Sequence, residues 1–152
     1  MKNSVKVVLD TNIFINGLFN DSVSCSQILD CIDKRTIRLY FSQDTIGELF
    51  YVIKNFARNQ IDSPEEREDL LHNISDLFLY SMSVNTKNTE TKKSKDKYDD
   101  MFIECAETGK VNYLISDDIK SGLHEMQFEK FKVLNSIDFV KTLEERLISK
   151  VI

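Results

Sequence analysis

The sequence predicts an α/β fold, a three-layer α/β/α sandwich around a central, mainly parallel sheet of about five strands. Short apolar runs that fit buried strands alternate along the chain with longer segments in which apolar residues recur at helical spacing. Strands that are apolar throughout are typical of a parallel sheet covered by helices on both faces. With 152 residues the chain is long enough for a sizeable core, and we expect one domain over residues 1–152.

The first strand is expected near the N-terminus, where Val7-Val8-Leu9 forms an apolar run that stops at Asp10. Pro64, followed by two glutamates, marks the start of a later helix, because proline is accepted at the first helical position and acids favour the first turn. Further strands are expected over 37–41, 78–84, 111–115 and 131–134. Helices are expected over 13–19, 22–33, 42–58, 64–77, 99–109 and 136–150, with Ser136 as the cap of the last and a short helix or turn over 121–125.

The composition is ordinary for a soluble globular protein, with 41% hydrophobic and 30% charged residues. No apolar run approaches the roughly 20 residues that span a bilayer. No secretory signal is evident either, so we expect a cytoplasmic protein without a membrane partner. Three cysteines without a CxxC pair and only two histidines argue against disulfides and zinc. The net charge of −5 leaves two possibilities: nucleic acid is not the ligand, or the acids are concentrated in a metal site while the basic residues lie elsewhere.

Four acidic residues are expected at the edge of the sheet formed by the carboxyl ends of the strands, where open α/β sheets bind ligands. Asp10 ends the first strand, and Asp118 lies just past the fourth. Asp99 begins the helix that leads into the fourth strand, and Glu48 lies beside the apolar face of the helix after the second strand. Each has an ordinary alternative, as a helix cap, a loop acid or a boundary residue.

A cluster of these carboxylates would need a cation or protons. Two carboxylates about 4 Å apart repel by about 4 kcal/mol at an effective dielectric constant near 20, so four together cannot all stay ionised unaided. Oxygen ligands without histidine or cysteine favour Mg²⁺ or Mn²⁺ over zinc. Such ions can activate water for attack on a phosphodiester, so no protein nucleophile is required.

Four blocks of the sequence carry a family resemblance. Residues 8–14 contain a hydrophobic-Asp-Thr-Asn start, and residues 41–49 a strand end, a serine and a helix bearing a glutamate. Residues 95–106 contain a Lys-Asp-x-x-Asp-Asp-x-Phe run into an alanine-containing helix, and residues 113–118 a strand followed by Ser-Asp-Asp. In this order and spacing the blocks resemble those of PIN-domain proteins, in particular the small prokaryotic VapC-like group, over nearly the whole chain.

The resemblance implies an endoribonuclease that depends on Mg²⁺ or Mn²⁺ and hydrolyses RNA phosphodiester bonds, with the toxin of a toxin–antitoxin pair as its biological role. It implies a cognate antitoxin as partner and a homodimer. The implied catalytic and metal-binding carboxylates are Asp10, Glu48, Asp99 and Asp118. Residues implied to hold them in place are Thr11, Asn12 and Ser116, with Asp96, Asp100 and Asp117 as auxiliary candidates and Lys92, Lys93, Lys95 and Lys120 as contacts to the RNA backbone.

The fourth block departs from the family's common Gly-Asp-Lys-Asp. Asp117 stands in place of the glycine, Ile119 of the lysine and Lys120 of the second aspartate, which bears on occupancy of a second metal more than on activity. The alternative interpretation is a catalytically degenerate PIN fold that binds RNA or acts as a scaffold. A haloacid dehalogenase-type phosphotransferase would need an aspartate where Asn12 stands, and a receiver-like domain would need one after the third strand, where residues 84–86 offer none.

Overall fold

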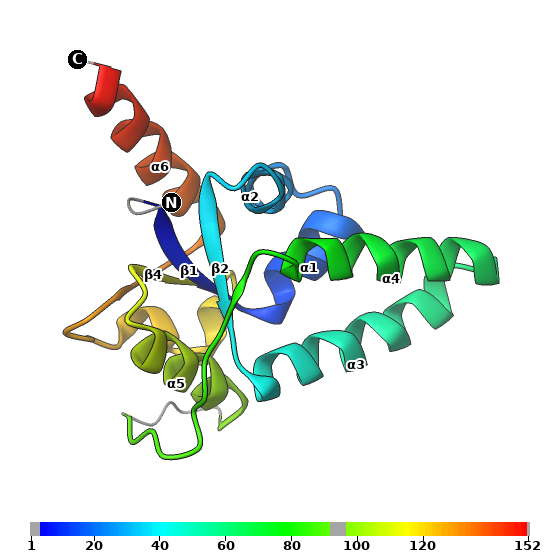
Figure 1. The fold of residues 1–152 in the computed structure, drawn as a ribbon, viewed down its shortest axis with the longest axis horizontal. Coiled ribbons are helices and arrows are strands. Elements are labelled where there is room, and N and C mark those ends of the chain that lie inside the picture. Colours follow the sequence, from blue (N-terminus) through cyan, green and yellow to red (C-terminus); the bar gives the residue numbers. More distant parts are fainter. Residues whose placement is uncertain (1–3, 92–96, 152) are drawn as a thin grey trace.

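The computed structural model of the protein describes residues 4–91 and 97–151. In this part of the chain a five-stranded sheet with the order β3-β2-β1-β4-β5 forms the middle layer (Figure 1), and every strand pair is parallel. The strands are β1 (Val5–Leu9), β2 (Ile37–Phe41), β3 (Met82–Ser83), β4 (Tyr113–Ile115) and β5 (Lys132–Leu134). The predicted three-layer α/β/α class is confirmed.

Helices cover both faces of the sheet. The α-helices of the described residues are α1 (Thr11–Leu18), α2 (Val23–Asp33), α3 (Gln43–Gln60), α4 (Pro64–Phe78), α5 (Asp100–Gly109) and α6 (Ser136–Val151). Three short 3₁₀ turns accompany them: η1 (Lys97–Asp99), η2 (Ile119–Ser121) and η3 (Leu123–Glu125). None of the helices in residues 4–91 and 97–151 combines the length and the apolar character that a bilayer span requires.

The central strand β1 explains why the core has two halves. Successive side chains of a strand point to opposite faces, so Val7 and Leu9 join the cluster formed with α1–α4 and α6, while Val8 joins the cluster formed with α5. All three side chains are at most 4% exposed. An apolar run without alternation is therefore what a strand covered on both sides requires.

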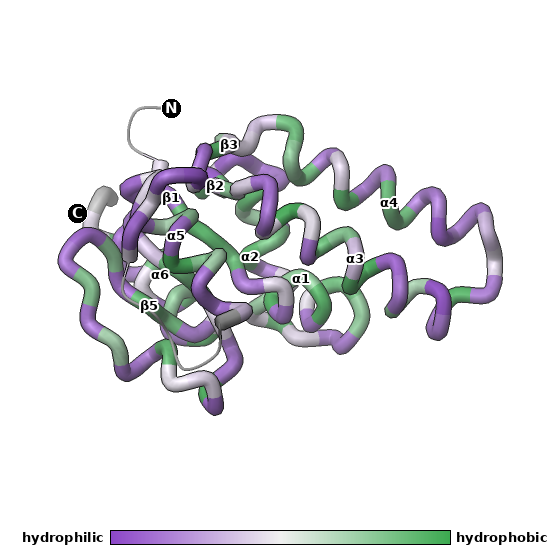
Figure 2. Tube along the Cα trace, turned by 90° about the horizontal axis from the view of Figure 1, so that it is seen from below, coloured by the Kyte–Doolittle hydropathy of each residue, from purple (hydrophilic) through white to green (hydrophobic). Residues whose placement is uncertain are grey.

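Helices α3 and α4 lie side by side and extend away from the sheet as an arm (Figure 1). Figure 2 shows hydrophilic and hydrophobic segments alternating along α4, as expected of an amphipathic helix. Ile53 of α3 and Ile74 of α4 are fully buried. As predicted, α4 begins at Pro64, and the Ser63 hydroxyl accepts a hydrogen bond from the Glu66 N–H at 3.4 Å.

The third strand is shorter than the sequence predicts. Residues 78–84 are apolar enough for a strand, but α4 continues to Phe78, and β3 is limited to Met82–Ser83. Phe78 belongs to the helix because its ring packs with those of Phe41 and Phe50, at centroid distances of 5.2 and 6.2 Å. Leu79, the next residue, is 68% exposed. The apolar run therefore combines a helix end, a turn and a short strand.

The cap of α6 also differs from the prediction. Ser136 is the first residue of the helix, and the Asn135 side chain accepts a hydrogen bond from the Asp138 N–H at 2.7 Å. This is the bond that an N-cap residue makes. Ser136 therefore does not cap the helix, and its N–H and hydroxyl donate to the Asp117 carboxylate.

Candidate functional site

Asp10 lies directly after β1, at the carboxyl edge of the sheet. Its N–H donates to the Ile115 carbonyl at 2.9 Å, which extends the pairing with β4 past the end of the strand. Its carboxylate accepts a hydrogen bond from the Ser116 hydroxyl at 2.7 Å and is 6% exposed. The side chain makes no capping hydrogen bond to α1. Capping, the ordinary explanation for an aspartate at this position, therefore does not account for it.

Ser116 bonds to two of the candidate residues, the side chain of Asp10 and the backbone of Asp118. It is fully buried at the end of β4. While its hydroxyl donates to Asp10, the same oxygen accepts the N–H of Asp118 at 3.2 Å. Parallel strands β1 and β4 end side by side, and this one serine connects the residue after β1 to the loop after β4. Asp118 itself is half-buried.

Glu48 reaches the same edge from α3. The helix starts directly after β2 with a reciprocal capping box, in which Ser42 and Thr45 bond each other's backbone N–H groups at 3.2 and 2.9 Å. This fixes the first turn and brings Glu48, one turn later, opposite α1. The buried Thr11 hydroxyl donates to Glu48 Oε2 at 2.6 Å, whereas the neighbouring Asn12 is exposed.

Asp99 occupies the N-cap position of α5 and is 5% exposed. Its side chain does not cap the helix either. Helix α5 leads into β4 and packs against β1, β2 and α3. Because a helix that connects parallel strands runs antiparallel to them, its first turn lies at the carboxyl edge of the sheet. Asp100, the first residue of α5, is half-buried beside it.

The carboxylates at this edge influence one another electrostatically. Burial raises the pKa of the Asp10 carboxyl, the hydrogen bond from Ser116 lowers it, and the negative charges of Glu48 and Asp118 raise it again. The dominant cause is desolvation, which disfavours the ionised form. The charges of Glu48 and Asp118 are thus close enough to Asp10 to oppose the ionisation of its carboxyl.

The donor set fits a hard divalent cation in chemical type. Within residues 4–91 and 97–151, no three His, Cys, Asp or Glu side chains are already close enough together to hold a metal. Mg²⁺ is usually held by one or two carboxylates and keeps several waters, so a preformed group of three is not required. An all-oxygen site with a desolvated aspartate at its centre suits Mg²⁺ or Mn²⁺ better than zinc.

Asp117 makes structural contacts that account for both of its carboxylate oxygens. Oδ1 accepts the Ser136 N–H and Oδ2 the Ser136 hydroxyl, each at 2.7 Å. The buried Cys25 thiol lies 3.3 Å from Oδ2. The carboxylate thus joins the end of β4 to the starts of α2 and α6, which gives a physical reason for an aspartate at this position.

The candidate RNA contacts are only partly within the described residues. Lys120 lies in η2 and is exposed, next to Ile119, which is 74% exposed. Lys92, Lys93, Lys95 and the auxiliary candidate Asp96 lie outside the described residues.

His124 is a residue that the sequence does not single out. Its Nε2 atom lies 2.6 Å from the Ser116 carbonyl oxygen. Nothing in residue type or spacing indicates this contact, because it depends on how the loop after β4 turns back over eight residues.

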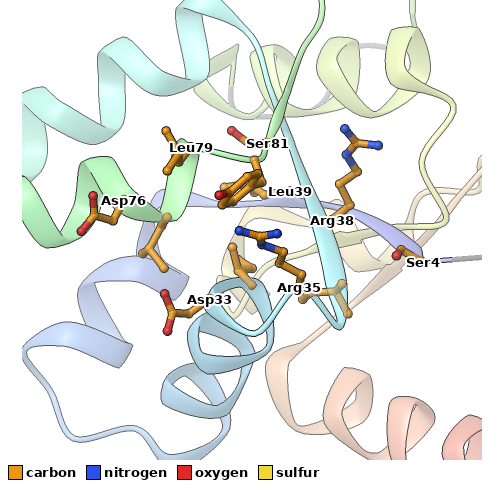
Figure 3. Close-up of a pocket in the computed structure, with 12 residues that line it drawn as sticks. Ser4, Asp33, Arg35, Arg38, Leu39, Asp76, Leu79 and Ser81 are labelled. Carbon is orange, nitrogen blue, oxygen red and sulfur yellow. The ribbon is translucent and has the colours of Figure 1, made fainter. Parts of the chain in front are cut away.

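A cavity of about 530 Å³ lies at the opposite edge of the sheet (Figure 3), by the residue before β1 and the first residues of β2. The Arg35 guanidinium stacks on the Tyr80 ring at 3.3 Å from its centroid, across this cavity. Arg35 and Arg38 are accompanied by Asp33 and Asp76, so the lining carries both signs of charge. It is separate from the acidic edge described above.

These features define a class of protein: a parallel α/β/α domain with a buried aspartate and further acidic residues at the carboxyl edge of its sheet. The chain belongs to the PIN domain family, whose model matches residues 6–120. PIN domains are generally nucleases, and those nucleases generally use divalent metals. The match ends two residues after Asp118, and so includes all four candidate carboxylates.

Two individual proteins resemble the chain over most of its length. An uncharacterized protein of Methanocaldococcus jannaschii is 28% identical in an alignment 150 residues long that covers 95% of each chain. The crystal structure of VapBC2 from Rickettsia felis, bound to a DNA fragment from its promoter, matches with a TM-score of 0.55. That match covers 86% of this chain and 98% of the other at 13% identity, and it supports the fold.

Proposed function

We propose that the protein is an endoribonuclease that depends on Mg²⁺ or Mn²⁺ and hydrolyses RNA phosphodiester bonds. The observation that carries the proposal is the environment of Asp10 at the end of the central strand. Burial and the charges of Glu48 and Asp118 oppose the ionisation of this carboxyl, and a bound cation would relieve that cost. Membership of a family of nucleases supports phosphodiester hydrolysis as the reaction.

Asp10, Glu48, Asp99 and Asp118 are the proposed ligands and catalytic residues. The cation, when bound, would lower the pKa of an attacking water and stabilise negative charge on the leaving oxygen. The chain's own contribution is to hold the carboxylates in a fixed orientation and partly shielded from solvent. Two supports for this role are the bonds from Ser116 to Asp10 and from Thr11 to Glu48, at 2.7 and 2.6 Å. Asn12 belongs to the proposal only through its place in the sequence block, since its side chain is exposed.

RNA would be held by cations outside the acidic edge. The exposed Lys120 lies two positions after Asp118, so its ammonium group can reach a phosphate beside the site. The lysines at 92, 93 and 95 are proposed to contact the RNA backbone in the same way, and Asp96 and Asp100 to assist the carboxylates. This separation of charge is what an RNA-binding protein of net charge −5 requires.

We also propose that the protein is the toxin of a toxin–antitoxin pair and forms a homodimer. The structural neighbour from Rickettsia felis was solved as a VapBC2 complex with promoter DNA, which makes a small antitoxin the partner to test first. Sedimentation of the purified protein would test the dimer, and co-expression with the product of an adjacent small gene would test the antitoxin.

The decisive experiment is cleavage of a pool of structured RNAs by the wild type with Mn²⁺, by the wild type with EDTA, and by the Asp10→Asn/Asp99→Asn double variant with Mn²⁺. The matched control is Asp62→Asn, which makes the same chemical change at an exposed position on the turn between α3 and α4. We expect cleavage by the wild type and the control only when Mn²⁺ is present.

Two outcomes would contradict the proposal. Cleavage that persists in the double variant would exclude these carboxylates as the catalytic residues. RNA binding without cleavage by a folded wild type under all metal conditions would favour the catalytically degenerate alternative, in which the fold serves as an RNA-binding or scaffold module.

A further inference from the structure

We propose that His124 is a positioning residue for the candidate metal site. Its imidazole holds Ser116, and through Ser116 it orients Asp10 and Asp118 for cation binding. This inference rests on the proposed metal-dependent function for its consequence, but the contacts that carry it belong to the described chain itself.

Every hydrogen-bonding group of Ser116 has a partner. Its N–H donates to the Leu134 carbonyl at 3.0 Å, and its hydroxyl donates to Asp10 Oδ2 at 2.7 Å. The hydroxyl oxygen accepts the Asp118 N–H at 3.2 Å, and the carbonyl oxygen accepts from His124 Nε2 at 2.6 Å. A fully buried serine with four bonds has no freedom to reorient. By holding the Ser116 carbonyl, His124 helps to fix the backbone from which the hydroxyl reaches Asp10.

The Ser116 carbonyl needs a side-chain donor because it lies beyond the end of β4. Strand β4 ends at Ile115, one residue earlier, and the carbonyl is buried at the point where the chain leaves the sheet. A buried carbonyl without a donor is costly. The imidazole satisfies it and at the same time fixes the start of the loop that carries Asp118.

The loop is built to return His124 to this position. The Ser121 hydroxyl donates to the Asp118 carbonyl at 3.0 Å and accepts the Leu123 N–H at 3.3 Å. Gly122 has a φ of 77°, in the left-handed region that glycine adopts without steric cost, and so allows the chain to reverse just before η3. His124 lies within η3.

The contact also determines which nitrogen of the His124 ring carries the hydrogen. A carbonyl oxygen only accepts, so Nε2 carries the hydrogen. Within the described residues Nδ1 is buried without a hydrogen-bond partner, so the side chain contributes one polar contact, from Nε2. A glutamine amide can place a donor near the position of Nε2, whereas asparagine is too short and leucine has no donor. These three substitutions separate the hydrogen bond from the volume of the side chain.

The test compares His124→Gln, His124→Asn and His124→Leu with the wild type in three measurements. These are Mn²⁺ affinity by titration calorimetry, hydrogen exchange of the Asp118 amide without metal, and RNA cleavage. The matched control is His72→Leu, which removes the exposed histidine of α4. Loss of residues that orient metal ligands typically weakens metal binding by about 10–100-fold. We expect His124→Leu and His124→Asn to weaken Mn²⁺ binding by about tenfold, with His124→Gln and His72→Leu close to wild type.

Hydrogen exchange keeps the test independent of the proposed function. We expect the Asp118 amide to exchange faster in His124→Leu and His124→Asn than in His124→Gln, because its acceptor, the Ser116 hydroxyl, is no longer held. A merely structural role would lower the melting temperature without this order among the variants. If His124→Leu does not fold, amide exchange in His124→Asn compared with His124→Gln tests the inference on its own.

The outcomes distinguish two kinds of failure. If the wild type binds no Mn²⁺, the proposed metal-dependent function fails, and unequal exchange of the Asp118 amide would still establish that His124 orients Ser116. If the wild type binds Mn²⁺ but the glutamine and asparagine variants bind it equally well, the positioning role of His124 is wrong while the metal site stands. Equal amide exchange in those two variants would also overturn the inference.

Discussion

Replacing Asp10 by asparagine should stabilise the metal-free protein and abolish the stabilisation that metal gives to the wild type. Because burial and two neighbouring charges raise the pKa of Asp10, the folded protein binds its proton more tightly than the unfolded chain does. The contribution of Asp10 to the free energy of unfolding is then fully present below pH 3.8, the pKa of the carboxyl in the unfolded chain. It is lost as the pH rises through the raised pKa of the folded state. Asparagine removes the charge and leaves a carbonyl oxygen to accept the Ser116 hydroxyl.

In EDTA at pH 7 the Asp10→Asn variant should be more stable than the wild type, because the asparagine has no charge to desolvate. Each kcal/mol corresponds to about 2–4 °C in melting temperature for a protein of this size. With Mn²⁺ at about 100 times its dissociation constant, the wild type should gain about 2.7 kcal/mol. The variant should gain none, so Mn²⁺ should raise the stability of the wild type relative to the variant by the whole of that amount.

Urea unfolding of both proteins measures this directly, in EDTA at pH 7, in Mn²⁺ at pH 7, and in EDTA near the unfolded pKa of 3.8, where the difference should shrink. The exposed Asp62→Asn is the matched control and should change nothing in either direction. A variant less stable than the wild type in EDTA would refute the argument, because it would mean that the Asp10 charge stabilises the metal-free fold. If Mn²⁺ stabilised the wild type and the Asp10→Asn variant equally, Asp10 would not be a metal ligand.

Four further predictions concern two helical glycines, a half-buried carboxylate and the thiols. A Cβ on Gly17 would lie 2.8 Å from a side-chain carbon of α2, so Gly17→Ala should lower the free energy of unfolding by about 1–3 kcal/mol. A Cβ on Gly47 would meet open space, so Gly47→Ala should raise the free energy of unfolding by about 0.5–1 kcal/mol, since alanine favours a helix. Urea unfolding measures the free energy of both variants. Asp117→Asn should cost about 1–3 kcal/mol through its bonds to the start of α6. It should leave Mn²⁺ affinity by calorimetry unchanged, and weaker Mn²⁺ binding would make it a ligand instead. Burial raises the pKa of Cys105 to about 12, so at pH 8 a thiol reagent followed by mass spectrometry should label the half-buried Cys31 first.

The sequence predicts the sheet well because its strands carry local signals. The strand predicted over 37–41 has the bounds of β2, and α4 begins at Pro64 as expected. The strand predicted over 78–84 is wrong in its first part, because the ring of Phe78 fits a strand and a helix end equally well until its neighbours are known. Local pattern does not decide between these, since the partners Phe41 and Phe50 come from other elements.

The site is predictable to the extent that topology alone brings residues together. Asp10 and Asp118 lie just beyond neighbouring parallel strands, so their proximity is a consequence of the predicted fold. The bonds from Asp117 to Ser136 and from His124 to Ser116 were not predictable, because they depend on the path of loops rather than on the pattern within an element. In our proposal these contacts position the acidic residues of the edge.

Those contacts divide the acids of the fourth block into two kinds. Asp117 is compensated by the protein itself, because it accepts the first N–H of α6 at 2.7 Å, where the helix dipole favours a negative charge. Asp10 is bonded by the Ser116 hydroxyl and the Thr11 backbone, but burial and the charges of Glu48 and Asp118 outweigh these bonds and raise its pKa. This difference between the two carboxylates supports the proposed cation site at Asp10 rather than at Asp117. We therefore propose that Asp117 belongs to the framework of the site and is not a ligand.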